Sequence, residues 1–202
     1  TYFLCQLNQN QLNNSLFPIG ELTKPEVRQI AEELDLPVAH KKDSTGICFI
    51  GERDFREFLK NYIPAKSGKM VDIVSKKVIG EHQGIMYYTI GQRKGLGIGG
   101  NGEPWFVVGK DYDKNILYIA QGDSNKWLLS HGALITDVNW ISATKPEGEY
   151  DCTAKFRYRQ KDNDVSLHFI DETTLYVTFK KPIKAVTPGQ AAVFYDGDVC
   201  LG

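Results

Sequence analysis

The chain has 202 residues, of which 42% are hydrophobic, and its 24 Lys and Arg nearly balance its 25 Asp and Glu, so that the formal net charge is -1. This length and composition allow a buried core and more than one small domain, while the charge excludes the strong basic bias of many nucleic-acid binders. No apolar run approaches the roughly 18 residues of a membrane span, and no charged-then-apolar leader opens the chain. We therefore expect a cytoplasmic protein without a membrane partner.

The first 63 residues are expected to be mainly helical, with one or two short strands. The segment Thr23–Glu26 reads as a capping box with a proline in the first helical turn. From Val27 onward, apolar residues recur at i, i+3, i+4 and i+7, which predicts an amphipathic helix that Pro37 ends. A second helix is predicted over 51–63, because it has aromatic residues on one side and a proline after it. Tyr2–Cys5 reads as a strand, and since both ends of the chain fall at strand-like runs, we expect both to be cut ends.

Cys48 lies between the two predicted helices and has the sequence context of a reactive thiol. Lys41 and Lys42 precede it, small polar residues and Gly46 predict a loop, and a helix is predicted to begin three residues later. Cations and helix N-termini stabilise thiolate over thiol, so its pKa is expected to fall below the free value of about 8.5. From local chemistry alone, a catalytic thiol and an ordinary loop cysteine both remain open.

The other cysteines and the histidines predict neither a zinc site nor a disulfide framework. No two cysteines form a CxxC pair, and no histidine stands at ligand spacing to a cysteine or to another histidine. Most of the histidines are expected to be surface or hydrogen-bonded core residues. Three cysteines lie in apolar strand-like runs, where buried and unreactive thiols are expected; they are Cys5, Cys152 and Cys200. We expect no bound metal.

From residue 68 the hydrophobic period changes to two, which predicts β structure. Four short strands are predicted over 70–74, 77–80, 105–109 and 116–120, with a hairpin connection at 111–115. The segment between residues 60 and 100 contains seven basic residues and only two acidic ones. Its local charge of about +5 suggests an anionic partner.

A glycine-rich loop, Gly91–Gly100, interrupts these strands. Residues 97–102 match GxGxxG, but a strand follows where a dinucleotide site needs a helix, and the P-loop spacing also fails. We expect a flexible loop that offers Gln92, Arg93 and Lys94 to phosphates, with a plain solvated loop as the alternative.

The last third of the chain has at least five strand signals, which predict a small barrel or sandwich. Within it, Lys155–Lys161 alternates basic with aromatic or polar residues, which on a strand would place cations on one face and Phe156 and Tyr158 on the other. A solvated face over buried aromatics and a contact with RNA phosphates both remain open. The predicted strands are 134–140, 152–158, 165–170, 175–179 and 191–195.

Four motifs together resemble the bacterial tRNA-specific 2-thiouridylases of the MnmA type, over the whole chain. They are Asp43–Glu52, which reads DSTGICFIGE, Tyr88–Gly97, which reads YTIGQRKGLG, Arg157–Gln160, which reads RYRQ, and Thr187–Tyr195, which reads TPGQAAVFY. The resemblance implies an enzyme that uses ATP to adenylate the wobble uridine of the tRNAs for lysine, glutamate and glutamine and then replaces its 2-oxygen with sulfur.

The resemblance also implies a fold and an incomplete site. The fold class is α+β, mainly β in the C-terminal two-thirds: 1–63 is the helical tail of a PP-loop ATP pyrophosphatase domain, 64–128 a small β-rich central domain, and 129–202 a six-stranded β-barrel that binds tRNA. The family's Ser-Gly-Gly phosphate loop and first catalytic cysteine are absent from these 202 residues. The ATP site is therefore expected outside this chain, which alone should be inactive.

By the same resemblance, Cys48 is the second catalytic cysteine, which carries sulfur as a persulfide from a cysteine desulfurase or a relay protein and can pair in a disulfide with the absent cysteine. The family's tRNA contacts correspond to Arg157, Tyr158 and Gln190. A contact of Arg93 and Lys94 with tRNA is a hypothesis from the residues alone. Two other functions remain open: an RNA-binding module in which Cys48 has no role, and a thiol redox protein that needs no RNA.

Overall fold

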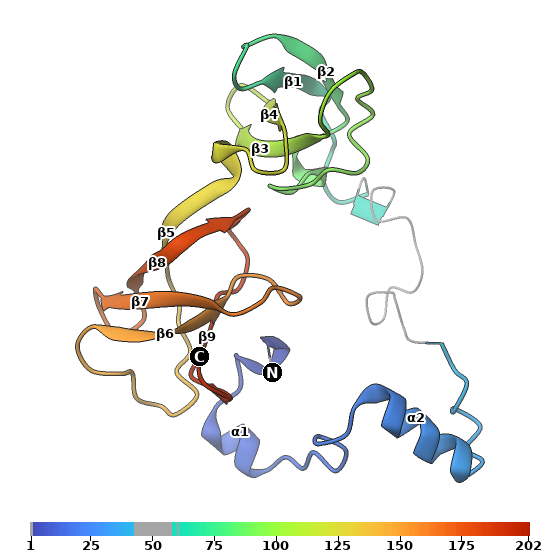
Figure 1. Ribbon diagram of the computed structural model, residues 1–202, viewed down its shortest axis with the longest axis vertical. Coiled ribbons are helices and arrows are strands. Elements are labelled where there is room, and N and C mark those ends of the chain that lie inside the picture. The colour runs from blue at the N-terminus through green and yellow to red at the C-terminus, as the bar shows by residue number, and fades with distance from the viewer. Residues whose placement is uncertain (1, 43–57, 60) are drawn as a thin grey trace. The chain divides into compact units, whose positions relative to one another are not determined.

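A computed structural model describes residues 2–42, 58–59 and 61–202 of the chain (Figure 1). These residues form two compact units, one made of Thr1–Gln9 with Pro64–Gly202 and the other of Asn10–Ile63. Cys48, its loop and most of the helix predicted over 51–63 lie outside the described residues. No helix in the described part of the chain is long and apolar enough to cross a membrane.

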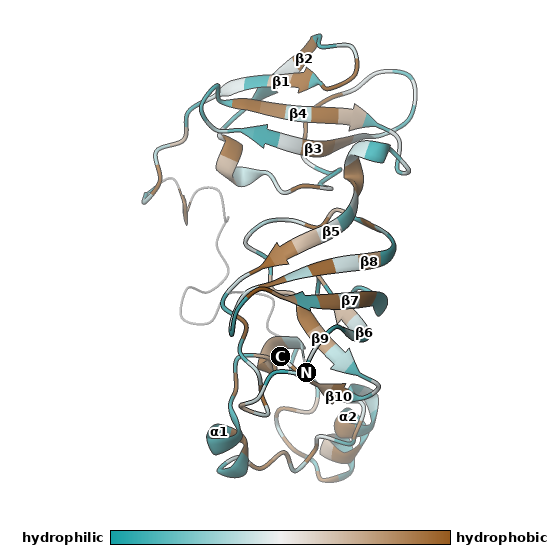
Figure 2. Cartoon of the chain, turned by 90° about the vertical axis from the view of Figure 1, so that its left-hand side faces the viewer, coloured by the Kyte–Doolittle hydropathy of each residue, from teal (hydrophilic) through white to brown (hydrophobic). Residues whose placement is uncertain are grey.

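The smaller unit contains the helix α2, Lys24–Glu33, which follows the short hydrophilic helix α1, Gln9–Asn13 (Figure 2). The predicted capping box is confirmed, since the Thr23 backbone N–H donates to Glu26 Oε2 at 2.6 Å. The helix ends before Pro37, where Asp35 adopts a positive φ of 48°. Its predicted apolar face remains largely in water, because Ile30 is 41% and Leu34 is 64% exposed.

The larger unit begins, after its N-terminal segment, with a four-stranded sheet in the order β2-β1-β4-β3. Only β1 and β4 run parallel. The four strands that the sequence predicts are confirmed, with shifts of one or two residues. Buried Met70, Val107 and Leu117 form its core together with His82, whose Nε2 lies 3.1 Å from the Asn115 carbonyl oxygen. The strands are β1 (Gly68–Asp72), β2 (Val78–His82), β3 (Trp105–Asp111) and β4 (Ile116–Gln121).

A six-stranded antiparallel sheet follows, in the order β10-β9-β6-β7-β8-β5. Phe156, Phe179 and Phe194 fill its core, and Leu175, Val177 and Phe179 alternate with exposed residues along β8. The described chain is thus mostly β with few helices, and the prediction that the C-terminal two-thirds are mainly β is confirmed. The strands are β5 (Leu129–Ile135), β6 (Tyr150–Lys155), β7 (Asn163–Phe169), β8 (Leu175–Lys184), β9 (Val193–Asp196) and β10 (Val199–Cys200).

Three of the predicted elements differ in the structure. Tyr2–Cys5 is not a strand: Tyr2–Leu4 is a short 3-10 helix, because the buried Tyr2 side chain holds this segment through a bond from its hydroxyl to the Ala191 carbonyl oxygen at 2.9 Å. The strand predicted over 134–140 begins at residue 129 and ends at 135, since Asp137 has a φ of 58°. The strand predicted over 152–158 ends at Lys155.

Candidate nucleic-acid interface

The chain turns immediately after β6, which places the basic and aromatic residues of the segment 155–161 differently from the prediction. The Phe156 N–H donates to Gln160 Oε1 at 2.8 Å, and the Gln160 N–H donates to the Arg157 carbonyl oxygen at 3.0 Å. The Gln160 side chain therefore replaces the strand partner that Phe156 lacks. The predicted alternation of a basic and an aromatic face is wrong: Arg157 is half-buried, whereas Tyr158 and Arg159 are exposed.

Arg157 joins three segments that are distant in sequence. Its Nη2 donates to the carbonyl oxygens of Ile90 at 2.8 Å and Ala185 at 3.0 Å, and it lies 3.2 Å from Thr187 Oγ1. The Nε atom is buried without a hydrogen-bond partner, and no described residue accepts a bond from Nη1. One amino group of the guanidinium is therefore committed to protein oxygens, and the other has no hydrogen-bond partner among the described residues.

Ile90 leads directly into the glycine-rich loop, whose first residues are fixed. The Gly91 N–H donates to Val107 O at 2.7 Å, and the Val107 N–H donates to Gln92 O at 3.0 Å. Gly91 has a φ of 82°, and a Cβ atom there would lie 2.6 Å from the Cβ of Ala185. Only glycine allows this approach of the loop to the end of β8. The Arg93 and Lys94 side chains that follow are exposed, and no described acidic residue pairs with either.

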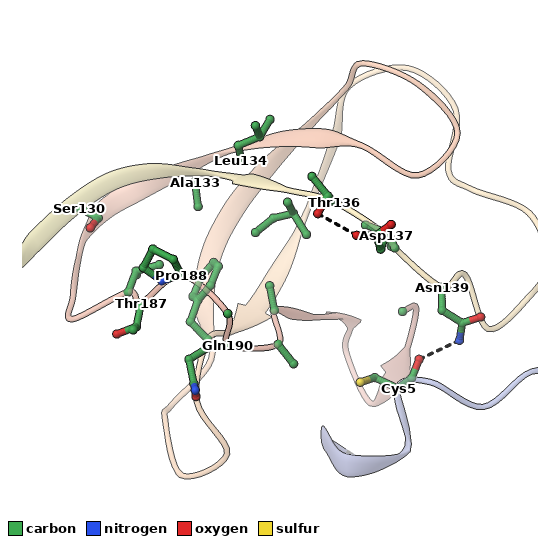
Figure 3. Close-up of a pocket in the computed structure, with 18 of the residues that line it drawn as sticks. Cys5, Ser130, Ala133, Leu134, Thr136, Asp137, Asn139, Thr187, Pro188 and Gln190 are labelled. Carbon is green, nitrogen blue, oxygen red and sulfur yellow. Dashed lines mark hydrogen bonds between the residues drawn. The ribbon is translucent and has the colours of Figure 1, made fainter. Parts of the chain in front are cut away.

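Gln190 lies on a turn after β8, next to a cavity. The Gln190 N–H donates to Thr187 O at 3.2 Å, and Gly189 has a φ of 80°. Gln190 is exposed and lines a cavity of about 590 Å³. Figure 3 shows Thr187, Pro188 and Gln190 on one side of this cavity and Leu134, Thr136 and Asp137 on the other.

Tyr158 packs against Phe3, a residue that the sequence analysis missed. The two ring centroids lie 4.5 Å apart, although the residues stand at nearly opposite ends of the sequence. An exposed phenylalanine near the start of a chain gives no pattern to detect, so only the fold reveals this pair. The structure thus brings Arg157, the loop with Arg93 and Lys94, and the turn with Gln190 together, and it adds Phe3 beside Tyr158.

The three described cysteines have raised thiol pKa values. Burial raises the pKa of Cys5 and of Cys200, and burial with the nearby Asp196 and Asp151 carboxylates raises that of Cys152 to about 12. Of the three predicted buried thiols, Cys5 is buried, whereas Cys152 and Cys200 are only partly buried. A raised pKa disfavours the thiolate, which is the nucleophilic form. No cluster of three or more His, Cys, Asp or Glu in the described part of the chain is arranged to hold a metal ion.

Comparison with known proteins accounts for nearly the whole chain. Three family models match in succession: the tRNA methyl transferase HUP domain over residues 1–52, the tRNA methyl transferase PRC-barrel domain over 56–121 and the aminomethyltransferase beta-barrel domain over 130–202. The tRNA-specific 2-thiouridylases MnmA of Bacillus cytotoxicus and Bacillus cereus are 58% and 57% identical over all 202 residues, which make up 54% of each relative's length. The chain, which spans about half the length of these relatives, belongs to the family of tRNA-specific 2-thiouridylases of the MnmA type.

Proposed function

We propose that this chain is part of an ATP-dependent tRNA sulfurtransferase, which replaces the 2-oxygen of the wobble uridine with sulfur in the tRNAs for lysine, glutamate and glutamine. The observation that carries the proposal is the 58% identity to a tRNA-specific 2-thiouridylase along all 202 residues. In this proposal, residues 1–63 belong to the catalytic domain, 64–128 form a central domain, and 129–202 form the domain that binds tRNA.

The tRNA contacts that we propose are Arg157, Tyr158 and Gln190, with Arg93 and Lys94 in support. An exposed tyrosine, an exposed amide and three cations suit an RNA whose bases are unpaired and whose phosphates are in reach. In this proposal Arg157 has two roles: Nη2 holds the loop and the turn, and Nη1, which bonds no described residue, would donate to a phosphate oxygen.

Cys48 is the proposed sulfur carrier, supplied by a cysteine desulfurase or a sulfur relay protein. The outer sulfur of a persulfide on this cysteine would attack carbon 2 of the uridine after its oxygen has been activated, and the activated oxygen would leave with the activating group. The thiol of the family's other catalytic cysteine, outside these 202 residues, would then attack Cys48 Sγ, so that the S–S bond of the persulfide breaks, a disulfide with Cys48 forms and the sulfur stays on the uridine. The carrier needs a low thiol pKa. Support comes from the described thiols, whose pKa values are raised and which are therefore poor candidates for this role.

ATP is the activating substrate in this proposal, but the residues of this chain do not fit a site for it. The sequence holds no Ser-Gly-Gly phosphate loop, so we place that site in another part of the full-length protein. The exposed Ile30 of α2 and the exposed Leu34 directly after it suit a surface that a larger catalytic domain covers. The 202 residues alone should therefore produce no 2-thiouridine from ATP and tRNA.

The test is a thiolation assay of the full-length protein with Cys48→Ser. We expect the variant to bind tRNA with unchanged affinity and to form no 2-thiouridine, which mass spectrometry of the digested tRNA measures. Retained thiolation would refute the sulfur-carrier role. An RNA-binding module would show salt-sensitive tRNA binding and no thiolation in any variant, and a thiol redox protein would turn over at Cys48 without tRNA.

A further inference from the structure

Phe3 and Tyr158 form an exposed pair of aromatic rings that no other part of the described chain covers. Their ring centroids lie 4.5 Å apart, with the planes inclined at 39°. Phe3 is 73% exposed and Tyr158 is 56% exposed. Adjacent aromatic rings that stay in water after folding are typical of binding surfaces. The pair is therefore a candidate binding surface.

The segment that carries Phe3 is held firmly on the six-stranded sheet. Tyr2 is buried, bonds the Ala191 carbonyl oxygen at 2.9 Å and contacts the Phe3 ring edge-on at a centroid distance of 5.7 Å. Further along, Asn139 Nδ2 donates to the carbonyl oxygens of Cys5 at 2.8 Å and Leu7 at 3.0 Å. The Phe3 ring is therefore positioned before any ligand arrives, which lowers the entropic cost of binding.

The charge beside the ring pair identifies the kind of ligand. The segment 155–161 contains Lys155, Arg157, Arg159 and Lys161 and no acidic residue. Lys155 pairs with Asp162 at 3.5 Å, whereas Arg159 and Lys161 are exposed and have no acidic partner among the described residues. Unpaired cations next to exposed rings are the combination that binds single-stranded nucleic acid, with phosphates on the cations and bases on the rings.

We infer that Phe3 is a further tRNA-binding residue, which together with Tyr158 forms a two-ring platform for one unstacked base of the tRNA. Arg159 and Lys161 neutralise the phosphates on either side of that base. This inference rests on the proposed function, because it takes tRNA as the substrate. An apolar protein surface is the less suitable occupant, since it would leave Arg159 and Lys161 without anionic partners.

The test uses the full-length protein and an unmodified tRNA transcript with uridine at the wobble position. Phe3→Ala should raise the Kd by about 5-fold to 150-fold, the range expected for one lost base–aromatic stack. The slope of log K against log salt should not change, because no charge is removed. Tyr112→Ala is the matched control: Tyr112 is 67% exposed and lies on the β3–β4 hairpin, so this variant should keep the original Kd.

A spectroscopic variant separates stacking from a merely structural role. Phe3→Trp should retain tRNA affinity, and its added fluorescence, measured against the unsubstituted protein, should be quenched by tRNA and unaffected by a fully paired duplex RNA. Because Phe3 is mostly exposed, both variants should keep the original circular dichroism spectrum.

Each other result counts against the platform. If Phe3→Ala leaves the Kd unchanged while the unsubstituted protein binds tRNA, the platform is refuted and the proposed function stands. If Phe3→Ala weakens only the binding of the sulfur-donor protein, the rings bind a protein partner instead. If the unsubstituted full-length protein itself fails to bind tRNA, the proposed function falls and the platform falls with it.

Discussion

Replacing Arg157 with methionine tests whether one guanidinium holds the glycine-rich loop and the Thr187–Gln190 turn in place. Methionine retains most of the aliphatic stem and removes the donors to Ile90 O and Ala185 O. Each charge-assisted bond of this kind contributes about 1.5–3 kcal/mol. Removing the buried, unpaired Nε atom recovers about 1 kcal/mol.

The free energy of unfolding should fall by about 2 kcal/mol, which is the low end of the difference between these two contributions. The low end is expected because Arg157 is only half-buried and water can replace part of each bond. Ala185 O also keeps its bond from Thr187 Oγ1 at 3.0 Å. For a unit of about 150 residues, 1 kcal/mol corresponds to about 2–4 °C in Tm. Thermal unfolding followed by circular dichroism should therefore show a decrease of about 4–8 °C.

Arg159→Met is the control, since it removes the same group from an exposed residue two positions away that has no described partner. Its effect on stability should stay within about 0.5 kcal/mol. In tRNA binding, by contrast, Arg159→Met is not silent, because it should reduce the slope of log K against log salt by about one. Equal Tm values for the two variants would refute the structural role of Arg157.

Three further results are expected. Gly91→Ala should destabilise the protein by about 1–2 kcal/mol or more in urea unfolding, because it forces alanine to a φ of 82° and into contact with Ala185; a stability equal to that of the control Gly99→Ala, which meets no atom within 4 Å, would contradict this. Iodoacetamide at about pH 7.5 should label Cys48 before any other thiol of the chain, because a pKa of about 12 leaves only about 3 in 100,000 of the Cys152 thiols ionised. Labelling of Cys152 should increase only as the pH rises toward that value. Early labelling of Cys152, mapped by mass spectrometry, would count against its raised pKa. Thr23→Ala should raise the pKa of the Glu26 carboxyl, which hydrogen bonds from the Thr23 side chain and backbone hold low; an unchanged NMR titration of Glu26 would contradict the capping box.

Helix caps and hairpins could be predicted because each depends on a short stretch of sequence. The capping box at Thr23–Glu26 and the β3–β4 hairpin depend on residues within a few positions of one another, and both are present. The end of β6 was predicted wrongly for the same reason, since the local pattern of Lys155–Lys161 is compatible with a strand as well as with a turn. Only the bond from Phe156 N–H to the Gln160 side chain decides between them.

The candidate site depends on contacts that no local pattern contains. Ile90, Arg157 and Ala185 meet only because two sheets come together in one unit, and Phe3 reaches Tyr158 only because Tyr2 is buried on the six-stranded sheet. The resemblance to a family supplied Arg157 as a tRNA contact, but it gave no indication that the same side chain has a second role. Cys48 stays a prediction from sequence, since it lies outside the described residues.

The geometry of Arg157 gives a physical reason why the two motifs around it act together. The Tyr88–Gly97 and Thr187–Tyr195 segments have no common sequence pattern, yet each contributes an oxygen to the same Nη2 atom through Ile90 and Thr187. A shift of either segment would strain or break the bond to the other, because a planar guanidinium fixes the directions of its donors. One side chain therefore helps to set the spacing between the backbone of the loop and that of the Thr187–Gln190 turn, and in the proposed tRNA site this would position both segments before the RNA binds.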